Sequence, residues 1–430
     1  MVGVNAKHVL VALCLLVSTA GCTERPAVDA AGTTRGPITF VDGQDTTSGR
    51  RVEELVKRWN SARGNDERVT FVEMPTSTDG HRAQLMARAQ DLDGVRDRAA
   101  YRSQCYDVMT LDVVWTAAFA EAGYLEPLDG NEFDVARYLP QSLRAATFAD
   151  RLWAIPGRSD AGLLYYRKDL LDAAGKRPPR DWAELVNLAE TVAPRAGVDG
   201  YVGQFDQYEG LTVNAMEAIW ARGGDALPAG GTEVAINAPA ARAGIRMLAQ
   251  GFADGWIPEA ARGFHEEESL VAFRDGKALF LRNWAYAYAR LAAPDSPVAG
   301  KFGVTALPGP SALGGWNLAV SRCSAHQRTA REFIAFYTSD DNQRELFIRA
   351  GMAPTVRALY SDPELRARFP HFEQLGASVE AARNRPASAH YGQLSSVMQE
   401  YLHSALDSPE RTDAVLDRLA EAMAAALKGR

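Results

Sequence analysis

Strand-like and helix-like hydrophobic patterns alternate along the first part of the chain. Apolar runs rich in β-branched and aromatic residues predict strands at 38–41, 69–72 and 106–111. Apolar residues at helical spacing predict helices between and after them, at 52–59, 81–90 and 115–122. Thr47 or Ser48 suits the N-cap of the first helix. Short alternation of this kind is typical of an α/β layer with a mostly parallel sheet.

The pattern changes near Trp153. A strand is predicted at 162–166, and long helical patterns then dominate, at 182–192, 212–221, 238–251 and 269–274. Strand signals return at 302–305 and 318–320, and the chain ends with a helical pattern at 391–427. The change predicts a second structural region after the first.

The first 22 residues have the pattern of an export signal. An apolar stretch from Val9 to Val17 follows Lys7 and leads into Thr19-Ala20-Gly21-Cys22. A stretch this short does not span a bilayer, which takes ~20 residues. We interpret it as a secretory signal with a lipoprotein cleavage site, so that Cys22 carries the lipid. The alternative is an ordinary signal peptide with a chance cysteine.

Residues 23–36 are rich in Ala, Thr, Gly and Pro and predict a flexible tether between the lipid and the fold. After the signal, the sequence has no second apolar run of membrane-spanning length. The expected location is therefore the extracytoplasmic face of the cell membrane.

Composition narrows the class of protein. The chain is 47% hydrophobic and 23% charged, with a net charge of -7, which is typical of a soluble globular protein. The sequence has no basic stripe, so nucleic acid is not an expected partner. Once the signal is removed and Cys22 is lipidated, Cys105 and Cys323 remain, and outside the cytoplasm they are able to form a disulfide. Two separate buried thiols are the alternative.

Motifs for metal, nucleotide or nucleophilic chemistry are missing from the sequence. It contains no His-Glu-x-x-His, no Cys-x-x-Cys and no phosphate-binding Gly-rich loop, and its seven His are scattered. The segment 157–162 resembles a nucleophile elbow only loosely, because its second Gly is one residue too far. No cofactor and no metal are expected. A pair of carboxylates acting as a glycosidase remains an alternative, since the sequence fixes no distance between acidic residues.

Polar and aromatic residues gather near predicted strand ends. Asp45 and Ser48 follow the first strand, Asp112 ends the third, and Asp160 precedes the strand at 162–166. Ligands of open α/β sheets bind outside the carboxyl ends of the strands, so these side chains are expected to face one cleft from two lobes. Trp284 and Trp316 are candidates for packing against sugar rings, with core packing as the alternative.

Several sequence blocks, in order over about residues 37 to 425, resemble the extracellular solute-binding proteins of sugar ABC transporters, and most of all their trehalose/maltose-binding branch. The blocks are 111–115 (LDVVW), 123–129 (GYLEPLD), 160–171 (DAGLLYYRKDLL), 207–211 (QYEGL), 281–287 (LRNWAYA), 313–316 (LGGW) and 385–386 (RP).

The resemblance implies a two-lobed α/β fold of the type II periplasmic binding proteins, with discontinuous lobes joined by a hinge. The first lobe is expected at 37–152 and 308–352, and the second at 153–307 and 353–430. A sugar is expected between the lobes. By position, Asp112 and Asp160 would accept hydrogen bonds from its hydroxyls, Trp284 and Trp316 would stack on its rings, Gly315 would offer backbone, and Arg82 and Arg385 would donate. Glu209 and Glu266 are further candidates.

The sequence departs from the family pattern near the expected first sugar site. Ser48, with Asp45 nearby, stands where relatives often carry an acidic residue, and Arg158 stands where they often carry an aromatic one. Residues 91–104 resemble an insertion. These changes leave the identity of the sugar open, but the expected class of ligand is still a sugar.

The function implied is that of a lipid-anchored, monomeric receptor that performs no chemistry. It would capture a disaccharide, trehalose or a maltose-like α-glucoside, and present it to the permease of an ABC importer. Another oligosaccharide or polyol, an exported glycosidase and a surface sensor are the alternatives.

Overall fold

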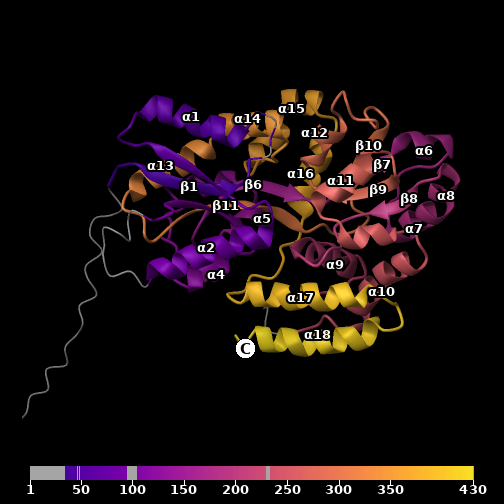
Figure 1. Cartoon of the computed structure of the whole chain (residues 1–430). Coiled ribbons are helices and arrows are strands. Elements are labelled where there is room, and N and C mark those ends of the chain that lie inside the picture. Colours follow the sequence, from indigo (N-terminus) through magenta and orange to yellow (C-terminus); the bar gives the residue numbers. More distant parts are fainter. Residues whose placement is uncertain (1–33, 46, 48, 94–103, 229–232, 430) are drawn as a thin grey trace, which may run out of the picture.

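The computed structural model describes residues 34–45, 47, 49–93, 104–228 and 233–429. The predicted signal, the lipid attachment at Cys22, most of the tether, Ser48 and most of the insertion at 91–104 lie outside the described residues. The described part folds into two lobes, each built around its own β-sheet (Figure 1). The two-lobed α/β prediction is confirmed.

The first lobe contains a five-stranded sheet in the order β2-β1-β3-β11-β6. Its elements are β1 (Ile38–Gly43), α1 (Arg51–Arg63), β2 (Val69–Met74), α2 (Thr78–Asp93), β3 (Val108–Asp112), α4 (Thr116–Glu121), η2 (Val135–Arg137), α5 (Pro140–Ala145), β4 (Thr147–Phe148), β5 (Arg151–Leu152), β6 (Ile155–Ala161), β11 (Leu313–Val320), α13 (Gln327–Tyr337) and α14 (Asp340–Ala350). β1 pairs in parallel with β2 and β3, whereas β11 runs antiparallel to β3 and β6.

The second lobe contains a four-stranded sheet in the order β10-β7-β9-β8. Its elements are β7 (Leu163–Arg167), α6 (Lys168–Ala173), α7 (Trp182–Thr191), α8 (Ala193–Ala196), β8 (Asp199–Val202), α9 (Glu209–Ala221), α10 (Pro239–Ala253), η3 (Glu259–Gly263), α11 (Glu266–Arg274), β9 (Ala278–Asn283), α12 (Ala287–Leu291), β10 (Phe302–Ala306), α17 (Tyr391–Ala405) and α18 (Thr412–Ala426). Between the lobes lie η4 (Arg357–Ser361), α15 (Pro363–Arg368) and α16 (Phe372–Ala381), whose apolar residues share one buried cluster with both sheets.

Apolar periodicity explains how the helices pack. In α1 the buried residues are those predicted from spacing, Val52, Leu55, Val56 and Trp59, and they join Phe40 of β1 in one core cluster. α9 is buried on nearly its whole circumference and lies between the second sheet and the pair α17 and α18 (Figure 1). Two separate cores thus support two sheets, and the polar ends of their strands are left at the junction.

The chain crosses between the lobes three times: at Gly162, at residues 307–312 and at residues 382–390. The predicted first boundary, after residue 152, is wrong, because β6 hydrogen bonds within the five-stranded sheet. The change of pattern near Trp153 marks the end of the small β4–β5 hairpin instead. The boundary after residue 352 is also too early, since Ala353 bridges to Ser159 of β6.

Cys105 and Cys323 form a disulfide with a Cα–Cα distance of 5.7 Å. Cys105 precedes β3 and Cys323 follows β11, so the bond ties neighbouring antiparallel strands through two cysteines that are 218 residues apart in sequence. The predicted pairing is confirmed, and it ties together the two chain segments that build the first lobe.

The last residues of the predicted tether are docked on the first lobe. Gly36 donates its N–H to Thr329 Oγ1 at 3.2 Å, and Arg35 forms ion pairs with Glu67 and Glu332. The expectation of a flexible tether is therefore wrong for residues 34–36, because Arg35 and Gly36 have partners on α13 and at Glu67.

In the described part of the chain, every helix is too short or too polar to cross a bilayer. The same residues include no cluster of three or more His, Cys, Asp or Glu arranged to hold a metal ion.

Candidate functional site

The register of the first sheet places predicted ligand residues side by side. Trp316 of β11 lies opposite Asp112 of β3 on one side and opposite Arg158 of β6 on the other, and Gly314 lies opposite Asp160. Directly paired residues point to the same face of a sheet, so these side chains form one polar and aromatic row. The row lies at the carboxyl end of β3, and ligands of open α/β sheets bind outside the carboxyl ends of the strands.

Gly315 allows β11 to approach β6 closely. Its φ is +120°, and a Cβ atom there would lie 2.3 Å from the carbonyl oxygen of Arg158. Only glycine fits this position. Gly315 therefore shapes the strand next to the row, and its own carbonyl accepts from Val113 N–H at 3.2 Å.

Arg385 joins the two lobes through carboxylates. On the crossing at 382–390, its guanidinium donates to Asp112 Oδ1 of the first lobe at 3.1 Å and to Glu209 of the second. Tyr391 Oη donates to the same Glu209 at 2.6 Å, and Ser395 Oγ also donates to it. Arg385 is 4% exposed, and its Nε has no hydrogen-bond partner among the described residues.

The charges of this network stabilise one another. Burial favours the neutral form of Arg385, but Asp112, Tyr391 and Glu209 together outweigh burial, so the pKa of Arg385 is raised. Burial raises the pKa of Asp112, and Arg385 opposes that rise. An unpartnered buried Nε–H beside two carboxylates is suited to a ligand that both accepts and donates hydrogen bonds.

Arg158 forms a second ion pair, which lies inside the first lobe. Its two Nη atoms donate to the Asp42 carboxylate at 2.7 and 2.8 Å, and its Cζ lies 5.1 Å from the centre of the Trp316 ring. Burial favours the neutral acid, but Arg158 outweighs it and lowers the pKa of Asp42.

Trp316 is packed within an aromatic cluster. His81 stacks on it with ring centres 5.2 Å apart, and Trp115 meets it edge-on at 5.5 Å. Burial lowers the pKa of His81 to about 4, so this imidazole is neutral at pH 7. Trp316 is thus a partly covered ring rather than an open stacking surface.

Asp160 reaches from the first sheet to the second lobe. Its Oδ1 accepts from the backbone N–H of Ala161 at 2.9 Å and of Ala285 at 3.0 Å. Burial raises the pKa of Asp160 to about 7, because no cation is paired with it directly.

Trp284 lies at the junction of the lobes. A Cβ atom added to Gly314 would lie 2.8 Å from the Trp284 ring, so the indole of the second lobe rests on the first sheet. Its Nε1 donates to Glu266 Oε1 at 3.3 Å, and Tyr208 Oη donates to Glu266 Oε2 at 2.8 Å. Glu266 therefore holds the indole.

Other predicted residues have different surroundings. The Asp45 carboxylate caps α1 by accepting from the N–H of Val52 at 2.9 Å and of Glu53 at 3.2 Å. Thr47, predicted as an N-cap, accepts from Arg51 N–H at 2.8 Å. Arg82 of α2 lies against Gly392 of α17, so it also faces the second lobe.

Sequence reasoning missed Asp42, Tyr208 and Tyr391. Asp42 lies near the carboxyl end of β1, as Asp112 does on β3, so the rule that singled out Asp112 would also have found it. The two tyrosines carry no local signal, because their partners Glu266 and Glu209 are distant in sequence.

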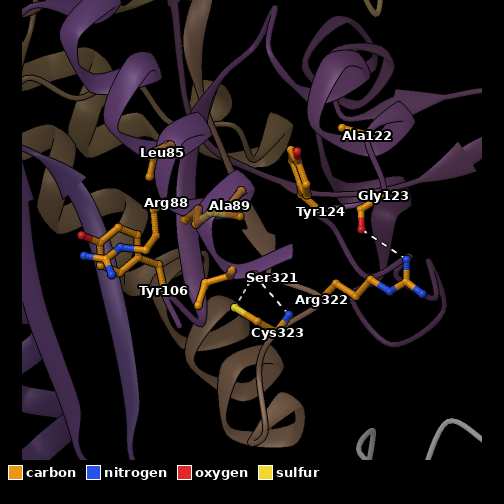
Figure 2. Close-up of a pocket in the computed structure, with 12 residues that line it drawn as sticks. Leu85, Arg88, Ala89, Tyr106, Ala122, Gly123, Tyr124, Ser321, Arg322 and Cys323 are labelled. Carbon is orange, nitrogen blue, oxygen red and sulfur yellow. Dashed lines mark hydrogen bonds between the residues drawn. The ribbon is translucent and has the colours of Figure 1, made fainter. Parts of the chain in front are cut away.

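Two cavities lie in the described part of the protein near these elements. One, of about 280 Å³, lies on the first lobe under α2 and beside Cys323, lined by Leu85, Arg88, Tyr106, Tyr124 and Arg322 among others (Figure 2). A smaller one, of about 30 Å³, lies at the lobe junction and is lined by Val113, Arg144, Arg385 and Pro386. Of the site residues identified above, Arg385 lines the smaller cavity.

Fold and site together define a receptor with two hinged lobes. Residues 43–344 match the family of bacterial extracellular solute-binding proteins, and the chain belongs to this family. Its members act outside the cytoplasm.

Named relatives agree with this membership. The chain is 32% identical to a probable ABC transporter-binding protein of Deinococcus radiodurans, over 86% of this chain and 89% of that one. It is 22% identical to a maltotriose-binding protein of Pyrococcus abyssi, over 73% and 69% of the two chains. Among solved structures, it is similar to maltose-bound MalE3 of T. maritima, with a TM-score of 0.80, 33% identity, and coverage of 90% and 99%.

Proposed function

We propose that this protein captures an α-glucoside disaccharide, maltose or trehalose, between its lobes and delivers it to the permease of an ABC importer. It performs no chemistry of its own. A lipid on Cys22 holds it at the outer face of the cell membrane as a monomer.

One observation carries the proposal: Arg385 is shared between Asp112 of one lobe and Glu209 of the other. A ligand drives lobe closure only through contacts that are better in the closed form. A sugar that bonds to residues of both lobes makes such contacts.

The chemistry of the site suits a sugar. The Asp112 and Asp160 carboxylates use Oδ1 for protein contacts, and their Oδ2 atoms have no hydrogen-bond partner among the described residues. Carboxylate oxygens accept from hydroxyls, the Arg385 Nε–H donates to them, and indole rings cover the apolar faces of pyranoses.

The ligand class is supported by the relatives. The solved structure with 33% identity holds maltose, and a curated relative is named for maltotriose. Both names describe α-linked glucose units, which favours an α-glucoside over an unrelated solute.

Calorimetric titration with maltose, trehalose, sucrose, glucose and longer α-glucans tests the proposal. We expect binding of a disaccharide, weakened at least about tenfold in Asp112→Ala and in Asp160→Ala, because an unpaired buried hydroxyl costs ~1–3 kcal/mol. Asp172→Ala, at an exposed position of α6, is the control and should bind as the unchanged protein does. Unaltered affinity in both site variants would remove Asp112 and Asp160 from the site.

The anchor and the lack of chemistry have separate tests. Cys22→Ala should release the protein from membranes into the soluble fraction. Incubation with trehalose should yield no free glucose, whereas steady glucose release would identify a glycosidase.

A further inference from the structure

A buried ion pair that is not itself among the proposed ligand contacts lies where the chain crosses between the lobes. Arg282 of β9 donates from Nε to Glu217 Oε2 at 2.9 Å and from Nη2 to Oε1 at 2.7 Å. The two side chains are 1% and 4% exposed. The remaining Nη1 donates to Gln204 Oε1 at 3.2 Å, so every nitrogen of the guanidinium has a partner.

A buried ion pair is weak evidence for stability, because apolar residues of similar volume often stabilise a fold equally well. The backbone groups that this pair contacts are therefore more informative than its contribution to stability.

The pair is in contact with the interlobe crossings. Glu217 Oε1 also accepts the backbone N–H of Ala312, on the second crossing, at 3.0 Å. At the first crossing, a Cβ atom on Gly162 would lie 2.7 Å from Glu217 Oε1 and 2.8 Å from Arg282 Nη2. Both crossings thus contact Glu217, and the first also lies against Arg282.

The third crossing is attached to the second. Arg383 N–H donates to Ser311 O at 2.9 Å, and Leu313 N–H donates to Arg383 O at 2.8 Å. A rotation of the lobes about the three crossings must therefore change the surroundings of Glu217.

The other end of the pair faces the proposed ligand site. The Arg282 Cζ lies 3.9 Å from the centre of the Trp284 ring, close enough for a cation–π interaction. Trp284 in turn rests on Gly314 of the first sheet. One arginine thus lies between the indole at the lobe junction and the carboxylate that holds the crossing.

We propose, resting on the proposed function, that Arg282 and Glu217 are positioning residues that couple the ligand contact at Trp284 to the crossing at Ala312. Neither residue touches the ligand. A sugar packed on Trp284 restrains Arg282, Arg282 restrains Glu217, and Glu217 restrains the Ala312 N–H, so occupancy of the site favours one arrangement of the crossings.

Amide hydrogen exchange at Ala312, with and without maltose, tests this coupling. In the unchanged protein maltose should slow the exchange at least about tenfold. The double variant Arg282→Met with Glu217→Leu removes both charges together and leaves no unpaired ion in the core. In it, maltose should change the exchange less than about twofold, and maltose affinity should fall at least about tenfold.

If maltose still slows amide exchange at Ala312 in the folded double variant, the proposal is overturned. If that variant does not fold, Arg282→Lys takes its place, because it keeps a positive charge beside Glu217 but loses the planar fork over Trp284. Weaker affinity and a reduced maltose effect at Ala312 in Arg282→Lys support the coupling, and values equal to those of the unchanged protein overturn it.

A matched control uses the ion pair between Arg242 of α10 and Asp417 of α18, which lies within the second lobe and far from the crossings in sequence. Arg242→Met with Asp417→Leu should leave the maltose effect at Ala312 unchanged. Loss of the effect in this variant as well would overturn the specific role of Arg282 and Glu217.

A ligand-free measurement separates this proposal from the proposed function. Without sugar, Ala312 exchange should be at least about tenfold faster in the double variant, because its acceptor is gone. Absence of any sugar response in the unchanged protein would defeat the proposed function, whereas equal ligand-free exchange in the two proteins would defeat the role of the pair.

Discussion

Asp42 and Asp160 are both carboxylates of the first sheet, yet their surroundings differ. Asp42 is held by two hydrogen bonds from Arg158 of the same lobe, and its pKa is lowered. Asp160 accepts only backbone N–H groups, one of them from Ala285 of the other lobe, and burial raises its pKa to about 7.

The difference separates charges that hold one lobe together from charges that respond to lobe movement. Arg158 and Asp42 keep their contacts in any arrangement of the lobes, because both belong to the five-stranded sheet region. Asp160 and Arg385 bond across the junction and must exchange partners when the lobes separate. The second group is therefore the one suited to sensing a ligand.

The largest effect is expected at the interlobe centre. Arg385→Met leaves the buried Asp112 and Glu209 carboxylates without their cation, which should lower the free energy of unfolding by ~3–5 kcal/mol. Urea unfolding measures it. Arg411→Met, at an exposed position, is the control and should change little. Unchanged stability in Arg385→Met would mean that the lobes are not held through this side chain.

Arg158→Met tests the ion pair inside the first lobe. It should lower the free energy of unfolding by ~2–4 kcal/mol at pH 7, because Asp42 is buried and loses its partner. The folded pKa of Asp42 is lowered, so the stability from the pair is fully present above the unfolded pKa of about 4 and is lost as pH falls through the folded pKa. The difference in free energy of unfolding between the unchanged protein and Arg158→Met should therefore shrink toward pH 3, as measured by urea unfolding. A gap that widens in acid would contradict this assignment.

Asp160→Asn should have the opposite pH signature. The folded pKa of Asp160 is about 7, so between pH 4 and 7 the folded state holds a proton that the unfolded chain has released, and stability falls as pH rises. The variant lacks this loss and should be more stable at pH 8 by ~1–3 kcal/mol. Thermal unfolding from pH 4 to 8 measures it, with Asp172→Asn as control. Parallel pH profiles for variant and unchanged protein would rule out the raised pKa.

The smallest effects are expected from the two tryptophans. Trp284→Phe should weaken maltose binding about tenfold, since the indole of Trp284 lies at the junction and its Nε1 holds Glu266. Trp316→Phe should weaken it less than about threefold, because His81 and Trp115 already cover that ring. Calorimetry gives both values, and the reverse order would place the sugar in the first lobe beside Trp316.

Much of the fold was predictable because it rests on local pattern. The strands near 38–41 and 69–72 and the buried face of the first helix follow from apolar spacing and hold in the structure. The lobe boundary was not predictable from pattern, since β6 joins its sheet through β11, which lies about 150 residues later in the sequence. A pairing over that separation leaves no local signal.

The site residues also divide into those whose role the sequence indicated and those whose role it did not. Strand-end position and family resemblance brought Asp112, Arg385 and Glu209 into consideration, and the structure places them in direct contact. Asp45 looked equivalent in sequence, but its carboxylate caps α1. Position after a strand does not distinguish a helix cap from a ligand contact, because both need an accepting oxygen at the same place.

The sequence by itself determined the alternation of strands and helices, the two cysteines able to pair and the residue types that suit a polar ligand. Only the tertiary structure decided which of those residues meet: Arg385 between two lobes, Arg158 with Asp42, and Arg282 with Glu217 behind Trp284. The reason is physical. Local pattern fixes which face of an element is buried, whereas the partners of a buried charge come from elements far apart in sequence, which only packing brings together.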